Sequence, residues 1–266
     1  MDNIYEDYGY EDVLLNSPCE YKDIFIYPIK VKDWNKFGKY IYYFILSKKH
    51  YGIKEEDSLL EAVFVNNVLQ RNGGKPPETK ETDELLSKFV LSEMCKAFEL
   101  ITNIKGISFM YNKGYKFISE NKIVIDDNNF DDIRRIVLSQ NILFEPIIYE
   151  SKFQQKWAEK VKRGRSKNNK GIGFEEIINI VRCGLGISYQ EIANMNIFQL
   201  YSDFRRITNT KEFETISLLK TTYGMEWDKL PNTNYTDSVI DKLITNPEKD
   251  YFKDFDMGDM QEILNG

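Results

Sequence analysis

The chain has 266 residues, and its 42% apolar content is enough to fill the core of one large domain or two ordinary ones. Its net charge is -6 and its sequence pI is about 5.2, so the molecule as a whole is not electrostatically attracted to nucleic acid or to an anionic membrane. The sequence has no apolar run of about 18 residues, and it begins with an acidic stretch, which argues against a membrane span or a signal peptide. Three widely spaced cysteines argue against a disulfide framework. We therefore expect a globular cytosolic protein.

The N-terminal stretch is acidic and contains several tyrosines. The first twenty residues hold six carboxylates, interleaved with Tyr5, Tyr8 and Tyr10. This pattern fits either a solvated arm or a peptide that docks on a partner. The isoleucines and aromatics of Tyr21–Lys32 then predict one or two strands, which Pro28 restricts to an edge or a bulge.

The next hundred residues alternate between helical and strand patterns. Asp33 is the predicted cap of an aromatic helix, WNKFGKYIYYFILSKK, and Ser58 that of the helix SLLEAVFVNNVLQ. The longest helical run is Thr82–Thr102, with a broad apolar stripe that indicates core. Three short segments bounded by turn residues, GISFMY, GYKFIS and KIVID, predict a small antiparallel meander. Asn129 is the expected cap of the helix FDDIRRIVL.

The composition changes after Pro146. The segment from Ser151 to Gly171 holds eight basic residues against one acid, Glu159, and we interpret it as a basic linker. Its first half is predicted to be helical through Trp157, while RGRSKNNKG is expected to be mobile because it has no apolar anchor. The segment is either a solvated hinge or a nucleic-acid contact. In the second case its cations would contact phosphates and its aromatics Phe153 and Trp157 could stack on bases. The candidate contacts are Lys160, Lys162, Arg163 and Arg165.

The remainder of the chain carries the densest helical pattern. Apolar residues recur at helical spacing in three runs, separated by two glycines and by the polar break Thr208-Asn209-Thr210. Ser188 and Glu191 have the form of a capping box, and Gly224 is positioned to end the last helix. We expect a small bundle of short helices followed by an acidic tail, whose role is either solubility or the binding of a partner or of the basic linker.

One apolar stripe of this bundle is a candidate partner surface. Ile197, Leu200, Tyr201 and Phe204 share one face of a helix, and the next run repeats the pattern. Both stripes cannot be fully buried in so small a bundle unless the N-terminal part covers one of them. An uncovered stripe would form an apolar patch of the size that marks interaction surfaces. Core and interface therefore stay open as alternatives for these four side chains.

A search for catalytic chemistry gives no candidate site. His50 is the only histidine and lies at a predicted helix end, which fits a surface or capping role. Glu120 and Lys122 have the form of the end of a metal-dependent nuclease motif, but the aspartate that such a site needs on a preceding strand is absent. The sequence contains no phosphate loop and no dinucleotide fingerprint. We therefore predict no catalytic residue, no metal site and no cofactor.

Three phrases together resemble tail-morphogenesis proteins, of the tail-assembly chaperone type, of phages and prophages of low-GC Gram-positive bacteria. They are SPCEYKDIFIYPIKVKDW (Ser17–Trp34), FDDIRRIVLSQN (Phe130–Asn141), and GFEEIINIVRCGLGISYQEIANMNIFQLYSDFRRI, which begins at Gly173. The resemblance covers some 65 residues and includes no catalytic signature. It implies a chaperone that coats the extended tape-measure protein and helps recruit tube subunits. The acidic end after Gly224 departs from this pattern, so a structural component of the particle stays an alternative.

These observations lead to one reading of the chain. We expect a mainly helical α+β protein with an N-terminal α/β domain (1–148), a basic helix and hinge (149–171), a helical bundle (172–224) and an acidic tail (225–266). The leading function is a non-enzymatic phage tail assembly or virion-interaction protein, located in the bacterial host cytosol or in the virion. Its expected partners are the tape measure, tube or baseplate proteins or further copies of itself. The alternatives are a nucleic-acid-binding protein that acts through Lys152–Lys170 and an enzyme with a carboxylate-metal site.

Overall fold

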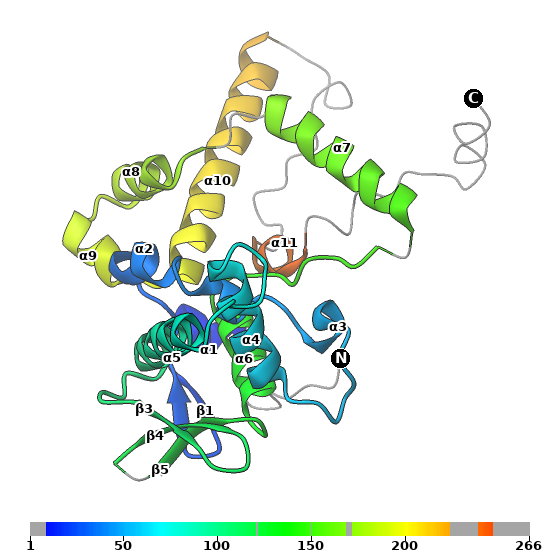
Figure 1. Cartoon of the computed structure of the whole chain (residues 1–266). Helices are drawn as coiled ribbons and strands as arrows, with labels where there is room; N and C mark the ends of the chain where they lie inside the picture. Colours follow the sequence, from blue (N-terminus) through cyan, green and yellow to red (C-terminus); the bar gives the residue numbers. More distant parts are fainter. Residues whose placement is uncertain (1–8, 121, 150, 169–171, 224–238, 247–266) are drawn as a thin grey trace, which may run out of the picture. The chain divides into compact units, whose positions relative to one another are not determined.

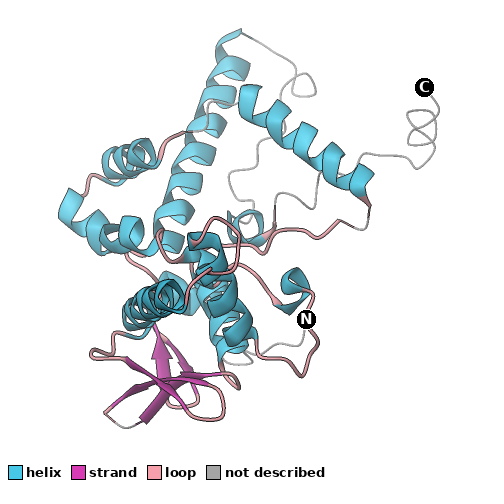
Figure 2. Cartoon of the chain, in the orientation of Figure 1, coloured by secondary structure: helices cyan, strands magenta, loops and turns pink. Residues whose placement is uncertain are grey.

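The computed structural model describes residues 9–120, 122–149, 151–168, 172–223 and 239–246. The predicted fold class is confirmed, because helices dominate the described residues and short strands form two antiparallel sheets (Figure 2). Contacts divide the chain into two compact units. The first contains residues 1–145 and 187–200, and the second contains residues 146–186 and 201–266. None of the helices in the described ranges is long and apolar enough to cross a membrane.

The first unit contains short strands and most of the helices (Figure 1). A hairpin joins β1 to β2 through Lys22 and Asp23, whose positive φ angles of 48° and 65° suit the twist of a two-residue turn. The sheet β3-β4-β5 is an antiparallel meander, as predicted. The elements up to Asn141 are α1 (Tyr10–Leu14), β1 (Cys19–Tyr21), β2 (Ile24–Ile26), η1 (Val31–Asp33), α2 (Trp34–Phe37), η2 (Ile41–Tyr43), α3 (Lys48–Tyr51), α4 (Leu59–Arg71), α5 (Lys80–Thr102), β3 (Ser108–Tyr111), β4 (Tyr115–Ser119), β5 (Lys122–Asp126) and α6 (Phe130–Gln140).

The core of the first unit is aromatic. Phe98 of α5 meets Phe117 of β4 edge to face at a centroid distance of 4.6 Å, and it contacts Phe130 of α6 at 6.0 Å. All three rings are fully buried. Such pairs add to the stabilisation from apolar burial, so these rings hold the meander on the helices.

Buried side-chain amides at the C-terminal end of α6 join the helix to β2 and to the residues that follow β2. Gln140 donates from Nε2 to the carbonyl of Ile26 at 3.0 Å, and Asn141 accepts the backbone N–H of Ile29 at 3.0 Å. Because a buried carbonyl or amide without a partner is costly, these contacts fix the position of the segment around Pro28.

One predicted helix start is confirmed in the first unit, and one predicted helix is wrong. Ser58 accepts the backbone N–H of Glu61 at 2.9 Å and so begins α4, as predicted. The aromatic helix predicted after Asp33 is wrong, because the chain forms the separate short pieces α2, η2 and α3 there. Phe37, Tyr43 and Phe44 of this region are all fully buried in one core cluster. Tertiary burial therefore overrides the helical spacing of these aromatics.

A later segment completes the first unit. It comprises α9 (Tyr189–Asn194) and the first turn of α10 (Ile197–Tyr223), which the sequence placed in the C-terminal bundle. The capping box of Ser188 and Glu191 at the start of α9 is confirmed. Asn196, fully buried, donates from Nδ2 to the carbonyl of Val13 at 2.6 Å. This contact between residues 183 apart has no signature in the local sequence.

The second unit contains α7 (Lys152–Asn168), α8 (Phe174–Leu185), the rest of α10, and α11 (Val239–Ile244). The predicted break at Thr208–Thr210 is wrong, because α10 continues through it to Tyr223. The hydroxyl of Thr208 donates to the carbonyl of Phe204 at 3.0 Å, and that of Thr210 to the carbonyl of Arg206 at 2.9 Å. These bonds one turn back keep both hydroxyls within the helix instead of ending it.

Glycine permits a close approach of α8 and α10. A Cβ added at Gly184 would lie 2.5 Å from Cδ1 of Ile207, closer than two carbon atoms can pack. The absence of a side chain at Gly184 therefore lets the isoleucine of α10 reach the backbone of α8.

The basic segment is more helical than the sequence indicated. Helix α7 runs to Asn168, so most of RGRSKNNKG lies within it rather than forming a mobile linker. Lysine and arginine are good helix formers, and they propagate the helix that Trp157 and its neighbours begin. The predicted domain limits at 148, 171 and 224 stay predictions. The predictions for the first eight residues, for Gly224 and for most of the acidic tail lie outside the described residues.

Candidate functional site

Helix α7 has three distinct faces. At about 100° per residue, positions four and seven apart fall on the same side of a helix. One face is apolar and half-buried, with Phe153, Trp157 and Val161. A second face lines a pocket, and a third carries exposed cations.

The cationic face has a regular spacing. Lys152, Lys156, Lys160 and Arg163 are all exposed and follow one another at helical intervals of four, four and three residues. With a rise of about 1.5 Å per residue, neighbouring cations are separated by roughly 5 to 6 Å along the axis. We call these four residues the basic stripe.

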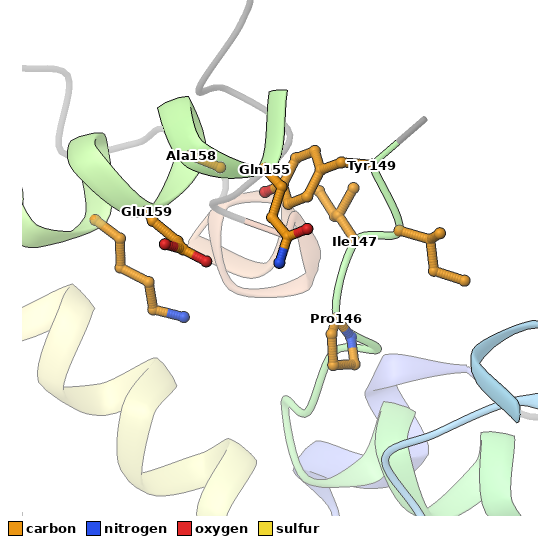
Figure 3. Close-up of a pocket in the computed structure, with 8 residues that line it drawn as sticks. Pro146, Ile147, Tyr149, Gln155, Ala158 and Glu159 are labelled. Atoms are coloured by element: carbon orange, nitrogen blue, oxygen red, sulfur yellow. The ribbon is translucent and has the colours of Figure 1, made fainter. Parts of the chain in front are cut away.

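The pocket lies between α7 and the extended segment 146–149 (Figure 3). Its volume is about 370 Å³, in the range of sites that hold a small molecule or a buried anchor side chain. Side chains of Gln155 and Glu159 point from α7 toward the space that Pro146 borders (Figure 3). The lining residues are Pro146, Ile147, Ile148, Tyr149, Gln155, Ala158, Glu159 and Lys162.

The pocket combines apolar walls with two opposite charges. Ala158 is buried, and Ile148 on the facing segment keeps 52% of its surface exposed. Glu159 and Lys162 are exposed and three residues apart on the helix, so a carboxylate and an ammonium group both line the opening. An apolar centre with a polar border is the usual composition of a protein interface.

The predicted partner stripe is divided by the structure. Ile197 and Leu200 are 1% and 0% exposed in the first unit, so they are core and offer no surface. The cause is the contact of the first turn of α10 with the N-terminal segment, where the backbone N–H of Ile197 donates to the carbonyl of Ile29 at 3.1 Å. Tyr201 and Phe204 belong to the second unit and are half-buried.

Two polar groups near this point are affected by burial. Burial raises the pKa of the Tyr201 hydroxyl and that of the Asp203 carboxyl above their ordinary values. Desolvation disfavours the charged form of each group, which accounts for both directions. Asp203 was not singled out from the sequence, where an isolated aspartate in a helix gives no sign of burial.

The four residues predicted to contact nucleic acid all lie in α7, and three of them have exposed side chains. Lys160, Lys162 and Arg163 are exposed, while the side chain of Arg165 lies outside the described residues. Lys162 lines the pocket, so only Lys160 and Arg163 of the predicted set belong to the basic stripe. Phe153 and Trp157 are half-buried on another face, which separates the aromatics from the stripe.

His50, Glu120 and Lys122, which the sequence raised as candidates for catalysis or metal binding, have structural roles in their own segments. His50 accepts the backbone N–H of Ser47 on Nδ1 at 3.2 Å and so caps α3. Glu120 lies in the turn after β4 with a positive φ of 49°, and Lys122 begins β5. Within the described ranges, no group of three or more His, Cys, Asp and Glu side chains is placed to hold a metal ion.

Two comparisons with known proteins give a match, and one of them is located in the C-terminal part of the chain. A family described as YomV second domain matches residues 165–237. The chain is also similar to the SPbeta prophage-derived uncharacterized protein YomV of Bacillus subtilis (strain 168), with 24% identity over 98 residues, which are 37% of this chain and 41% of that protein. The match thus spans about two fifths of the relative. No solved structure matches the chain. These similarities support an association of the chain with a prophage.

Proposed function

We propose that the chain is a non-enzymatic prophage protein that binds other phage proteins during tail assembly, in the manner of a tail-assembly chaperone. Its partners would be tape-measure, tube or baseplate proteins, or further copies of itself. It would act in the host cytosol, with incorporation into the virion as a second location. The similarity to a prophage protein supports the phage context. The resemblance of three of its phrases to tail-morphogenesis proteins supports the role in assembly.

The observation that carries the proposal is the pocket between the segment 146–149 and α7. An anchor side chain of a partner, aliphatic or aromatic, would fill its apolar part, where Ile147, Tyr149 and Ala158 form the walls. Glu159 and Lys162 would then face charged groups at the border of the contact. Tyr201 and Phe204 stay predicted as additional partner contacts.

The proposal is tested with two matched isoleucine variants. Ile148 lines the pocket and is 52% exposed, while Ile172 is 51% exposed in the same unit and does not line it. Because both side chains are largely solvated, Ile148→Asp and Ile172→Asp should each change the free energy of unfolding by only about 0.5 kcal/mol. In the pocket, however, the new carboxylate would be desolvated by a bound apolar anchor.

The measurement is recovery of a phage tail protein with the tagged chain from the producing cell, identified by mass spectrometry. We expect Ile148→Asp to lose this protein and Ile172→Asp to retain it, with unchanged circular dichroism in both. Equal recovery by the two variants would show that the pocket is not the binding site. Recovery of host proteins alone would contradict a role in tail assembly.

A further inference from the structure

The basic stripe is a local exception on an acidic molecule. The chain has a net charge of -6, yet residues 152–163 of α7 carry five cations against the single acid Glu159. Lys152, Lys156 and Lys160 form no ion pair with any carboxylate of the described chain. Their charges are therefore available to an external anion.

We propose that the basic stripe binds duplex nucleic acid through its phosphate backbone. The four cations extend over about 17 Å of helix, given a rise of about 1.5 Å per residue. Each strand of a duplex presents one phosphate per about 3.4 Å of axis, so a linear row of cations can contact several phosphates of one strand. An extended, evenly charged polymer fits this row better than a compact anion, which would reach only one or two of the four.

The aromatic side chains distinguish this mode from single-strand binding. Proteins that hold single strands stack bases on exposed aromatics. On α7, Phe153 and Trp157 lie on a half-buried face away from the stripe. The contact is therefore made by charge, is independent of base sequence, and gains nothing from unpaired bases.

The number of phosphate contacts determines how strongly salt should weaken DNA binding. Four phosphate contacts, each with a slope of about 0.9, predict an affinity loss of about 150-fold between about 50 and 200 mM salt. Replacing the three lysines by glutamine removes three contacts and should reduce that loss to about 4-fold. The affinity of this variant at about 50 mM salt should fall by tenfold or more.

The experiment uses the full chain and a fluorescent duplex DNA of about 30 base pairs, long enough to exceed the stripe. Fluorescence anisotropy compares the unchanged chain with the triple variant K152Q/K156Q/K160Q. The matched control is K75Q/K80Q/K88Q, which removes three exposed lysines of the first unit and changes the net charge equally. We expect K152Q/K156Q/K160Q to bind the duplex weakly and K75Q/K80Q/K88Q to bind it as the unchanged chain does. The variant K152R/K156R/K160R should bind normally, which separates loss of charge from loss of folding.

Three results would overturn the proposal. The first is equal weakening by both glutamine variants, which would indicate a general charge effect. The second is failure to favour duplex DNA, seen either as a clear preference for single-stranded DNA of the same length or as no binding to the duplex at about 50 mM salt. The third is tighter stripe-dependent binding of polyglutamate than of DNA, which would identify an acidic peptide as the occupant. Each result leaves the pocket test intact, because that test reads out a phage protein.

Discussion

Replacing Arg134 by methionine should cost the first unit a large part of its stability. The guanidinium is fully buried in α6 and has three partners. It donates from Nε to Asp131 at 2.9 Å, from Nη1 to the carbonyl of Phe44 at 3.1 Å, and from Nη2 to Glu145 at 2.5 Å. Methionine keeps much of the side-chain volume but removes every donor.

The stability loss of Arg134→Met depends on how far each partner of the guanidinium is buried. Breaking a buried ion pair by removing one partner costs about 3 to 5 kcal/mol, because the remaining charge loses its compensation. Asp131 and Glu145 keep side-chain exposures of 27% and 36%, so water can replace part of what they lose. The buried carbonyl of Phe44 has no such access. We therefore expect a loss of about 3 kcal/mol, at the lower end of that range.

The neighbouring arginine is the matched control. Arg135 pairs with the same Asp131 at 2.7 Å, but its side chain is 50% exposed. Exposed ion pairs contribute about 0 to 1 kcal/mol, so Arg135→Met should have a small effect. Urea denaturation followed by circular dichroism measures both variants, and peptide-level hydrogen exchange shows whether the loss falls in α6. Equal losses for the two variants would refute the assignment of Arg134 as a buried ionic centre.

Two further predictions concern single residues of the chain. Asn196→Ala should lower the free energy of unfolding by about 2 to 4 kcal/mol, because it removes the acceptor of the Gln199 backbone N–H and the donor to the Val13 carbonyl. Ser188→Ala, in the exposed cap of α9, should lower it by only about 1 kcal/mol. Equal losses for the two variants in urea denaturation would contradict the buried role of Asn196. Burial raises the pKa of the Cys19 and Cys95 thiols to about 11. Since only the thiolate reacts, maleimide at about pH 8 should label the exposed Cys183 alone, and intact mass showing more than one label on the folded chain would be the contrary result.

Local chemistry made part of this fold predictable from sequence. The meander was readable because turn residues bound three short apolar segments, and its strands pair in that order. The caps of α4 and α9 were readable because Ser58 and Ser188 each bond to a backbone amide three residues on. The caps join residues three positions apart, and the meander pairs segments that follow one another in the chain, so a short window of sequence contains each interaction.

The sequence left questions open, or predicted the wrong structure, where distant contacts decide the outcome. The stripe of Ile197 and Leu200 has the same spacing whether it faces solvent or core, and its burial depends on residues such as Ile29, far away in the chain. Thr208 and Thr210 favour loops by composition, but their hydroxyls bond back into α10. The pocket had no sequence signature, because the segment 146–149 has no periodic pattern to reveal what it faces.

The basic segment shows how one wrong detail conceals a site. Its cations were visible in the sequence, but a helix assumed to end near Trp157 would align only Lys152 and Lys156. Extension of α7 to Asn168 brings Lys160 and Arg163 into the same row. Phe153 and Trp157 lie about 100° around the helix from that row, so the row itself offers charge without exposed aromatic rings.

The two proposals depend on different sides of the same helix. The residues of the pocket face centre about 100° around α7 from the basic stripe, so a partner protein and a nucleic acid need not compete for the same side chains. Both surfaces precede residue 165, where the match to the YomV second domain begins. The family match and the two binding surfaces therefore lie on separate parts of the chain. Loss of phage-protein recovery in Ile148→Asp with unchanged DNA binding would establish that independence, whereas simultaneous loss of both would mean that α7 acts as one continuous interface.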